Sequence, residues 1–428
     1  MSEKDLRQRK NVSREVEKEE DGVTSRILGG LLSAYHLSGG DSLYLERAEE
    51  LADRLMPAFN TPFGLPTTEV NLAMRTPVED PNNVVTTAEI ASIQLELRYL
   101  SRLTKNNEYW DKAENVMKII KKGMLPTNLT SVYMGSENGQ FLTSQVRLGF
   151  RGKSYYECLL KQYLQTAQTE PVYREMYERT MTAVHKLLLK KSAENNFIYA
   201  TELVPQVGRR GRVTWNSEHK QDHLVCFIGG SLMLGATTSG ANASQVSTPP
   251  RDEQLTENAR RDWKTGTAFI ETCMDFYKGT ATGLAPEIVH FKHAGDKEQP
   301  KDGNRDWYIK GARPAHRKPP YDARYRLSPE TVESLFLAYR LTGDEKYRQY
   351  GWDIFQSIEK YTHVATGGYA TILNVEDVNS KLEDRMETFF LSKTLKYLFL
   401  LFSDSNVVPL DSTLIRAALA VRLTNWPL

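Results

Sequence analysis

The stretch LFLAYRLTGDEKYRQYGWDIFQSI, residues 335–358, contains the pattern that decides the fold. An apolar helix ends in Leu-Thr, a polar turn with Gly343 and Asp344 follows, and Tyr347 opens a second amphipathic helix. Glycine and aspartate at such a break are typical of a helix end followed by a new start. The stretch therefore predicts two antiparallel helices joined by a short turn.

The same pattern recurs along the chain. Residues 31–55, 96–120 and 159–184 resemble the first stretch, with turns near residues 38, 104, 166 and 342. The last gap is close to three further repeats, and a truncated repeat begins at 394–406. Six or seven helical hairpins predict a closed α/α toroid or a solenoid. Strand signals are sparse and predict short hairpins only at 196–203 and 367–375.

The composition narrows the class of protein. Of the 428 residues, 40% are hydrophobic and 25% charged, and the net charge is +1, so nothing indicates a nucleic-acid or anionic-membrane partner. No apolar run reaches membrane-spanning length, and 395–402 reads as a buried core helix. Residues 1–22 are polar without a signal peptide, which taken literally indicates the cytosol. Three cysteines fit one disulfide plus a thiol, or no disulfide.

Two glutamates stand at the head of the helix that begins at 328. Ser328 is expected as its N-cap and Pro329 as its first residue. Glu330 and Glu333 then share one helix face beside apolar positions. A structural explanation is available, because a carboxylate in the first turn interacts well with the helix dipole and Glu333 can face water.

Similar acids recur in other repeats, which favours a functional explanation. Each is expected at or near the start of an apolar helix, and in a toroid these starts gather at one end of the central cavity. Like charges buried together need a cation, shared protons or hydroxyl ligands. The recurring acids are Glu89, Glu96, Glu157, Glu287, Glu330, Glu333 and Glu387. Glu89 is assigned a structural role, and His223 and His290, in apolar contexts, are expected to be satisfied core histidines.

Several stretches together resemble the class I α-1,2-mannosidases, glycoside hydrolase family 47, of the endoplasmic-reticulum type. They include RILGGLLSAYHLSG, SYYECLLKQYL, DHLVCFIGGSLMLGA, TGLAPEIVHF and METFFLSKTLKYLFLLFSD, and they cover about 26–404. The resemblance implies an all-α (αα)7 barrel, incomplete at its N-terminus. It also implies calcium-dependent removal of α-1,2-linked mannose from high-mannose N-glycans, with inversion.

The resemblance also implies residue roles. Glu330 matches the proposed general base and Glu287 an active-site acid. Cys226 and Cys273 match the family's disulfide, which would leave Cys158 as a thiol in an oxidising compartment. The matches to substrate-binding residues are Arg26, Arg151, Glu96, Glu157, Glu333 and Glu387.

The chain departs from the family pattern at several places. Gly22 stands where the family has a proposed general acid, and Lys153 where it has a catalytic aspartate. A lysine there can pair with Glu157 or its neighbours and take a cation's place electrostatically. Ser328 replaces a substrate-site arginine, and Thr424 does not align with the family's calcium-binding threonine, so no metal ligand is assigned.

The resulting expectation is a polar segment at 1–22, a mannosidase domain at 23–410 and a non-matching segment at 411–428. We expect a monomer of the endoplasmic reticulum or secretory pathway, with no signal or membrane anchor in this chain, that binds high-mannose N-glycans and not nucleic acid. Gly22 and Lys153 predict weak hydrolysis or none. The alternatives are an inactive glycan-binding protein of glycoprotein quality control and a non-functional truncated gene product.

Overall fold

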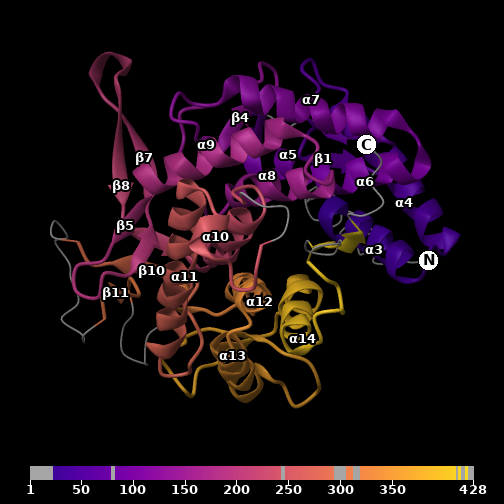
Figure 1. Ribbon diagram of the computed structural model, residues 1–428. Helices are drawn as coiled ribbons and strands as arrows, with labels where there is room; N and C mark the ends of the chain where they lie inside the picture. The colour runs from indigo at the N-terminus through magenta and orange to yellow at the C-terminus, as the bar shows by residue number, and fades with distance from the viewer. Residues whose placement is uncertain are drawn as a thin grey trace, which may run out of the picture. The chain divides into compact units, whose positions relative to one another are not determined.

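The computed structural model describes residues 23–78, 82–241, 246–293, 305–311, 319–410, 413–415 and 420–422. Gly22 and Thr424 lie outside these residues. The chain divides into two compact units: unit 1 comprises Met1–Val146, Ser154–Tyr177 and Asp411–Leu428, and unit 2 comprises Arg147–Lys153 and Glu178–Leu410. Figure 1 shows helices as the main elements of each unit, with short strands among them.

Unit 1 consists mainly of paired helices. Its elements are η1 (Val23–Leu28), α3 (Gly29–Leu37), α4 (Ser42–Leu55), η2 (Met56–Phe59), α5 (Thr87–Ser92), α6 (Gln94–Thr104), α7 (Asn107–Gly123), α8 (Lys153–Gln165, whose first residue belongs to unit 2) and the first part of α9 (Pro171–Leu187). Its strands form three antiparallel pairs: β1 (Glu69–Asn71) with β2 (Thr76–Val78), β3 (Val84–Thr86) with β4 (Tyr133–Gly135), and β14 (Thr413–Ile415) with β15 (Ala420–Arg422).

Polar side chains begin several of these helices as the sequence predicts. Asp41 accepts a hydrogen bond from the Leu43 amide at the start of α4. At α5, Thr86 and Glu89 form a capping box, in which each side chain accepts the other residue's backbone N–H. This arrangement satisfies amides that a helix start leaves unpaired. The structural role expected for Glu89 is thereby confirmed.

The four predicted helical hairpins are confirmed. The pairs are α3–α4, α6–α7, α8–α9 and α12 (Glu330–Thr342) with α13 (Lys346–Thr362). The helix α12 ends at Gly343, which has φ +70°, and α6 ends at Lys105, which has φ +62°. A left-handed residue at this position stops the helix and turns the chain, at no steric cost when the residue is glycine.

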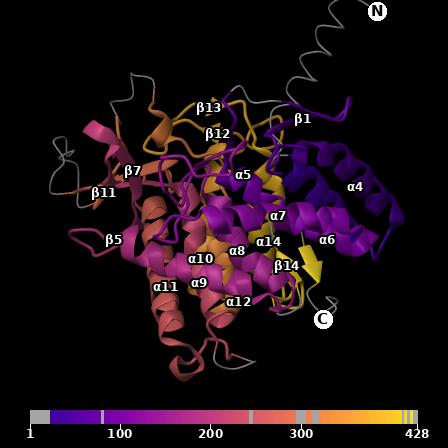
Figure 2. The same ribbon diagram turned by 90° about the horizontal axis from the view of Figure 1, so that it is seen from above.

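The centre of unit 2 is the helix α10 (Phe227–Thr237), which is buried on nearly all sides. It packs on α11 (Glu257–Lys278) and α12, and Figure 2 shows these three helices grouped together. A Cβ on Gly229 would lie 2.7 Å from Ile270, and one on Gly230 would lie 2.8 Å from the Ser334 Cα. Glycine therefore permits both close helix contacts, and a disulfide between Cys226 and Cys273 links the ends of α10 and α11 covalently.

The other elements of unit 2 are short. The remaining helices are η3 (Arg209–Gly211), η4 (His223–Cys226), η5 (Asp252–Gln254), η6 (Tyr321–Ala323), η7 (Phe390–Leu395) and α14 (Lys396–Phe402). The paired strands are β5 (Leu189–Lys191) with β6 (Ile198–Ala200), β7 (Glu202–Val207) with β8 (Val213–Glu218), and β12 (Thr371–Ile372) with β13 (Leu382–Glu383). The β7–β8 hairpin projects as a two-stranded arm (Figure 1), and every residue of β8 is exposed. The segments 196–203 and 367–375, predicted as short hairpins, do contain strands, but neither is a hairpin in itself, because β6, β7 and β12 pair with strands outside these segments.

Two sequence-based predictions about element starts are wrong. Glu287 does not begin a helix but precedes the strand β10 (Ile288–Phe291), which pairs with β9 (Lys220–Asp222) and β11 (Trp307–Tyr308) in an antiparallel sheet. Ser328 is not the cap of α12. The first helical hydrogen bond runs from the Glu333 amide to the Pro329 carbonyl, so Pro329 takes the cap position and Glu330 is the first helical residue.

The predicted core helix at 395–402 is confirmed as α14, although one side of it faces solvent. Tyr397, Leu398, Leu400 and Leu401 are buried, whereas Phe399 is 65% exposed. Among the residues that the structure describes, none of the helices is both long and apolar enough to cross a bilayer.

Candidate active site

Three predicted acids of unit 2 lie around three cationic side chains that no prediction had grouped with them. Glu287 precedes β10, Glu330 begins α12, and Glu387 lies just before a helical turn at 388. Arg326 joins two of them, because its guanidinium lies 3.8 Å from Glu287 Oε1 and donates a short hydrogen bond to Glu387 Oε1. Arg385 also contacts Glu387, at 2.8 Å.

Glu330 is held by the third cation. Its Oε1 accepts a hydrogen bond from Lys153 Nζ at 2.7 Å, although 177 positions separate the two residues. Both residues are buried, with 2% of Glu330 and 8% of Lys153 exposed. Burial alone raises the pKa of Glu330, but the Lys153 ammonium and then His223 more than offset this effect and bring the pKa to about 2. Glu330 is therefore a carboxylate at every physiological pH.

Glu287 has the opposite protonation behaviour. Burial, opposed by Arg326 and assisted by the negative charges of Glu330, Asp222 and Glu387, raises its pKa to about 7. At neutral pH this carboxyl therefore keeps a proton about half of the time. When the pKa values of two carboxyl groups in one unit differ this widely, one group can act as an acid and the other as a base.

His223 is a buried histidine that also faces the site. Its Nε2 shares hydrogen bonds with the hydroxyls of Tyr277, at 2.9 Å, and Thr331, at 3.2 Å, as expected for a core histidine. Its Nδ1, however, lies 3.6 Å from Glu330 Oε2. Within the described residues, neither of these two buried atoms has a hydrogen-bond partner. By contrast, His290 has an ordinary partner in Asp322, at 3.1 Å.

Asp222 is a further buried acid that the sequence reasoning missed. It ends β9 directly before His223, and its Oδ2 accepts the Phe150 amide at 3.1 Å. Lys220 Nζ lies 2.8 Å from Asp222 Oδ1 and 3.0 Å from Glu202 Oε1. The signal available in the sequence was an acid beside a histidine at a strand end, in one of the stretches that resemble the family.

The other predicted residues of unit 2 occupy separate positions. Glu333 is buried one turn along α12 and accepts a hydrogen bond from the Tyr397 hydroxyl at 3.0 Å, so it does not face water. Arg151 is exposed, with its guanidinium 5.2 Å from the centre of the Phe150 ring.

Three predicted residues belong to unit 1. Glu96 is fully buried in α6, and Glu157 accepts a hydrogen bond from Lys161 at 2.6 Å within α8. Arg26 is exposed in η1. The convergence of these residues with the acids of unit 2 on one cavity stays a prediction.

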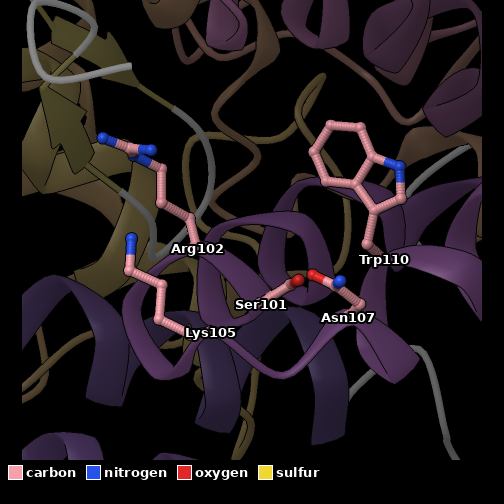
Figure 3. Close-up of a pocket in the computed structure, with 5 residues that line it drawn as sticks. All are labelled: Ser101, Arg102, Lys105, Asn107 and Trp110. Carbon is pink, nitrogen blue, oxygen red and sulfur yellow. The ribbon is translucent and has the colours of Figure 1, made fainter. Parts of the chain in front are cut away.

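Unit 1 contains a cavity of about 490 Å³ at the turn between α6 and α7. Figure 3 shows Arg102 and Lys105 extending along one side and the Trp110 ring on the other, with Ser101 and Asn107 between them. Among the residues that the structure describes, no carboxylate lines this cavity, so they offer no pair of acids for hydrolysis there.

In the parts of the chain that the structure describes, no three His, Cys, Asp or Glu side chains are placed to hold a metal ion. The positive charges beside Glu330, Glu287 and Glu387 come from Lys153, Arg326 and Arg385. The described residues therefore do not fit a calcium ion held by these carboxylates.

Paired helices that carry two buried carboxyl groups, one protonated and one ionised, are characteristic of helical glycosidases. Comparison with known proteins gives the particular family. The chain belongs to Glycosyl hydrolase family 47, whose sequence profile matches residues 6–417.

The chain is 40% identical over 414 residues to a mannosyl-oligosaccharide 1,2-alpha-mannosidase of Arabidopsis thaliana, covering 91% of this chain and 63% of the relative. It is 41% identical over 401 residues to the endoplasmic reticulum mannosyl-oligosaccharide 1,2-alpha-mannosidase of Homo sapiens, covering 91% of this chain and 50% of that protein. The chain thus spans about half to two thirds of the length of these relatives.

Among solved structures, an alpha-1,2-mannosidase from Trichoderma reesei superposes with a TM-score of 0.79 at 24% identity, covering 94% of this chain and 81% of that one. This likeness shows the fold, and it confirms the (αα)7 barrel that the sequence resemblance implied.

Proposed function

We propose that this chain is an α-1,2-mannosidase that removes α-1,2-linked mannose from high-mannose N-glycans. One observation carries the proposal: in unit 2, Glu287 retains a proton near neutral pH whereas Glu330 stays ionised. Hydrolysis with inversion needs one carboxyl group of each kind. The names of the relatives support the substrate class.

In the proposed reaction, Glu287 gives its proton to the glycosidic oxygen as the bond from that oxygen to the anomeric carbon breaks. Glu330 accepts a proton from the water whose oxygen bonds to the anomeric carbon on the opposite face. Oε1 of Glu330 accepts the Lys153 ammonium, whereas Oε2, buried 3.6 Å from His223 Nδ1, has no hydrogen-bond partner among the described residues; Oε2 is therefore the oxygen assigned to this proton. Attack from the opposite face inverts the anomeric configuration.

The proposed setting is the secretory pathway, with high-mannose glycoproteins as substrates and a monomeric enzyme. The disulfide between Cys226 and Cys273 supports an oxidising compartment. Family resemblance implies calcium dependence, but the described carboxylates do not fit the ion, so the proposal includes no calcium and assigns it no catalytic step.

The test is release of mannose from a high-mannose N-glycan, with proton NMR to identify the anomer first formed. Wild-type protein is expected to release β-mannose, and Glu330→Gln and Glu287→Gln are each expected to slow release by about 100-fold or more. Glu253→Gln is the control, because that side chain is 69% exposed. Release of α-mannose, or unchanged rates in both variants, would refute the assigned roles.

A second candidate function, glycan binding without turnover, is favoured by the contact between Lys153 and Glu330. A carboxylate with a pKa of about 2 is a weak base toward water. Calorimetric titration of the same glycan separates the two functions. Saturable heat with no mannose released would support the second, and absence of any binding would exclude both.

A further inference from the structure

Lys153 is a buried lysine whose ammonium contacts a carboxylate and an aromatic ring. It is the first residue of α8, and a cation at a helix N-terminus is unfavourable because of the helix dipole. Burial of its ammonium adds a further cost. Two partners offset these costs: Glu330 Oε1 at 2.7 Å and the face of the Phe227 ring, whose centre lies 5.3 Å from Nζ.

The backbone before Lys153 holds this side chain in position. The amides of Gly152 and Lys153 both donate to the Gly149 carbonyl, at 3.0 and 2.9 Å. A Cβ on Gly152 would lie 2.3 Å from the Arg147 carbonyl oxygen, so only glycine fits this tight turn. The Phe150 amide donates to Asp222, which ties the turn to β9. This hydrogen-bonded turn fixes the backbone of Lys153, from which the ammonium reaches Glu330.

Glu287 shows what happens to a buried carboxyl group without such a partner. Its closest guanidinium contact is with Arg326 at 3.8 Å, whereas Lys153 Nζ lies 2.7 Å from Glu330. Both carboxyl groups are buried, and only Glu330 is held as a carboxylate. The titratable groups whose charges act on Glu330, or on which its charge acts, are Lys153, His223, Tyr277, Glu287 and Tyr325.

We propose that Lys153 is a positioning residue that supplies the fixed counter-charge of Glu330. It keeps the buried carboxylate ionised and binds Oε1, so that the proton of the reacting water goes to Oε2, which is buried 3.6 Å from His223 Nδ1. The part played by the water rests on the proposed function, whereas the charge pairing does not. The Lys153 ammonium thereby provides, next to Glu330, the positive charge that a bound cation would otherwise have to provide.

A double-mutant cycle of denaturant unfolding tests the pairing without any assay of activity. Lys153→Met and Glu330→Gln are each expected to raise the equilibrium constant for unfolding by about 100-fold or more, because each removes the opposite charge that lies 2.7 Å from the remaining buried group. The double variant is expected to be markedly more stable than the sum of the two losses implies. Additive losses would overturn the proposal, whether or not the protein hydrolyses mannosides.

The pH profile of hydrolysis tests the second part. Wild-type protein is expected to keep its base ionised down to strongly acidic pH, whereas Lys153→Met is expected to move the acid limb of kcat/KM upward by about one pH unit or more. Lys153→Arg, which keeps the charge, is expected to restore the wild-type limb. A rate lowered equally at every pH would mean that Lys153 only supports the fold, and would overturn its role as counter-charge.

Arg98→Met is the control for this profile, because it breaks buried contacts with Glu114 at 3.0 Å and Glu170 at 2.8 Å, neither of which is a predicted site residue. It is expected to destabilise the protein without moving the acid limb. If no variant and no wild-type sample hydrolyses the glycan, the proposed function fails, and the double-mutant cycle still decides whether Lys153 and Glu330 are paired.

Discussion

Replacement of Glu287 by glutamine is expected to stabilise the protein in a pH-dependent way. Glu287 has an ordinary pKa of 4.5 and a pKa of about 7 in the folded chain, because burial disfavours its charged form. The folded state therefore binds this proton more tightly than the unfolded state does. The stability that the proton contributes is present in full below pH 4.5 and is lost as the pH rises through 7.

The size of the effect follows from the two pKa values. They differ by about 2.5, and each pKa unit corresponds to about 1.4 kcal/mol, so ionisation of Glu287 costs the folded state roughly 3 kcal/mol at alkaline pH. Glutamine has nearly the same shape and does not titrate. We therefore expect Glu287→Gln to match wild type near pH 4.5 and to exceed its free energy of unfolding by roughly 3 kcal/mol above pH 8.

Urea unfolding of both proteins from about pH 5 to about pH 9 measures this difference, since other titrating groups contribute nearly equally to both. Glu253→Gln serves as the control with an exposed side chain and is expected to show no such trend. A stability difference between Glu287→Gln and wild type that stays constant with pH would refute the reasoning. It would mean that Glu287 is ionised in the folded protein and is no proton donor near neutrality.

Three further results are expected. Cys226→Ala combined with Cys273→Ala removes a disulfide spanning 47 residues and is expected to lower the free energy of unfolding by about 4 kcal/mol, measured by urea unfolding; a loss below about 1 kcal/mol would contradict it. Arg98→Met is expected to cost about 3 kcal/mol by thermal or urea unfolding, because the fully buried Arg98 contacts Glu114 at 3.0 Å and Glu170 at 2.8 Å; an unchanged midpoint would show that the pairs contribute nothing. Removal of calcium with EDTA is expected to leave the unfolding midpoint unchanged, since the described carboxylates do not fit the ion; a midpoint that rises with calcium concentration would contradict this fit.

The helical hairpins were predictable because their signals are local. Apolar spacing, a polar turn and a capping residue all lie within about 25 neighbouring residues. Asp41 at the start of α4 and Gly343 at the end of α12 are examples. The start of α12 was misplaced by one residue because Pro329 can serve either as cap or as first helical residue. Glu287 was misassigned because a short apolar run fits a strand as well as a helix.

The chemistry of the candidate site was predictable only in part. The recurring acids marked Glu287, Glu330 and Glu387, and the family resemblance drew attention to Lys153. Arg326, Asp222 and the face of His223 toward Glu330 were not predicted. These side chains come from separate strands and loops, and nothing in local spacing records which of them will meet.

The amino-acid order was enough to establish the helical repeat and the acids at the start of α12, because both depend on residues a few positions apart. Folding in three dimensions was needed to bring Lys153 against Glu330 across 177 positions and to leave Glu287 without an equally close cation. The protonation of each carboxyl group depends on its burial and on the distance to neighbouring charges. Those two quantities exist only once distant segments have packed together.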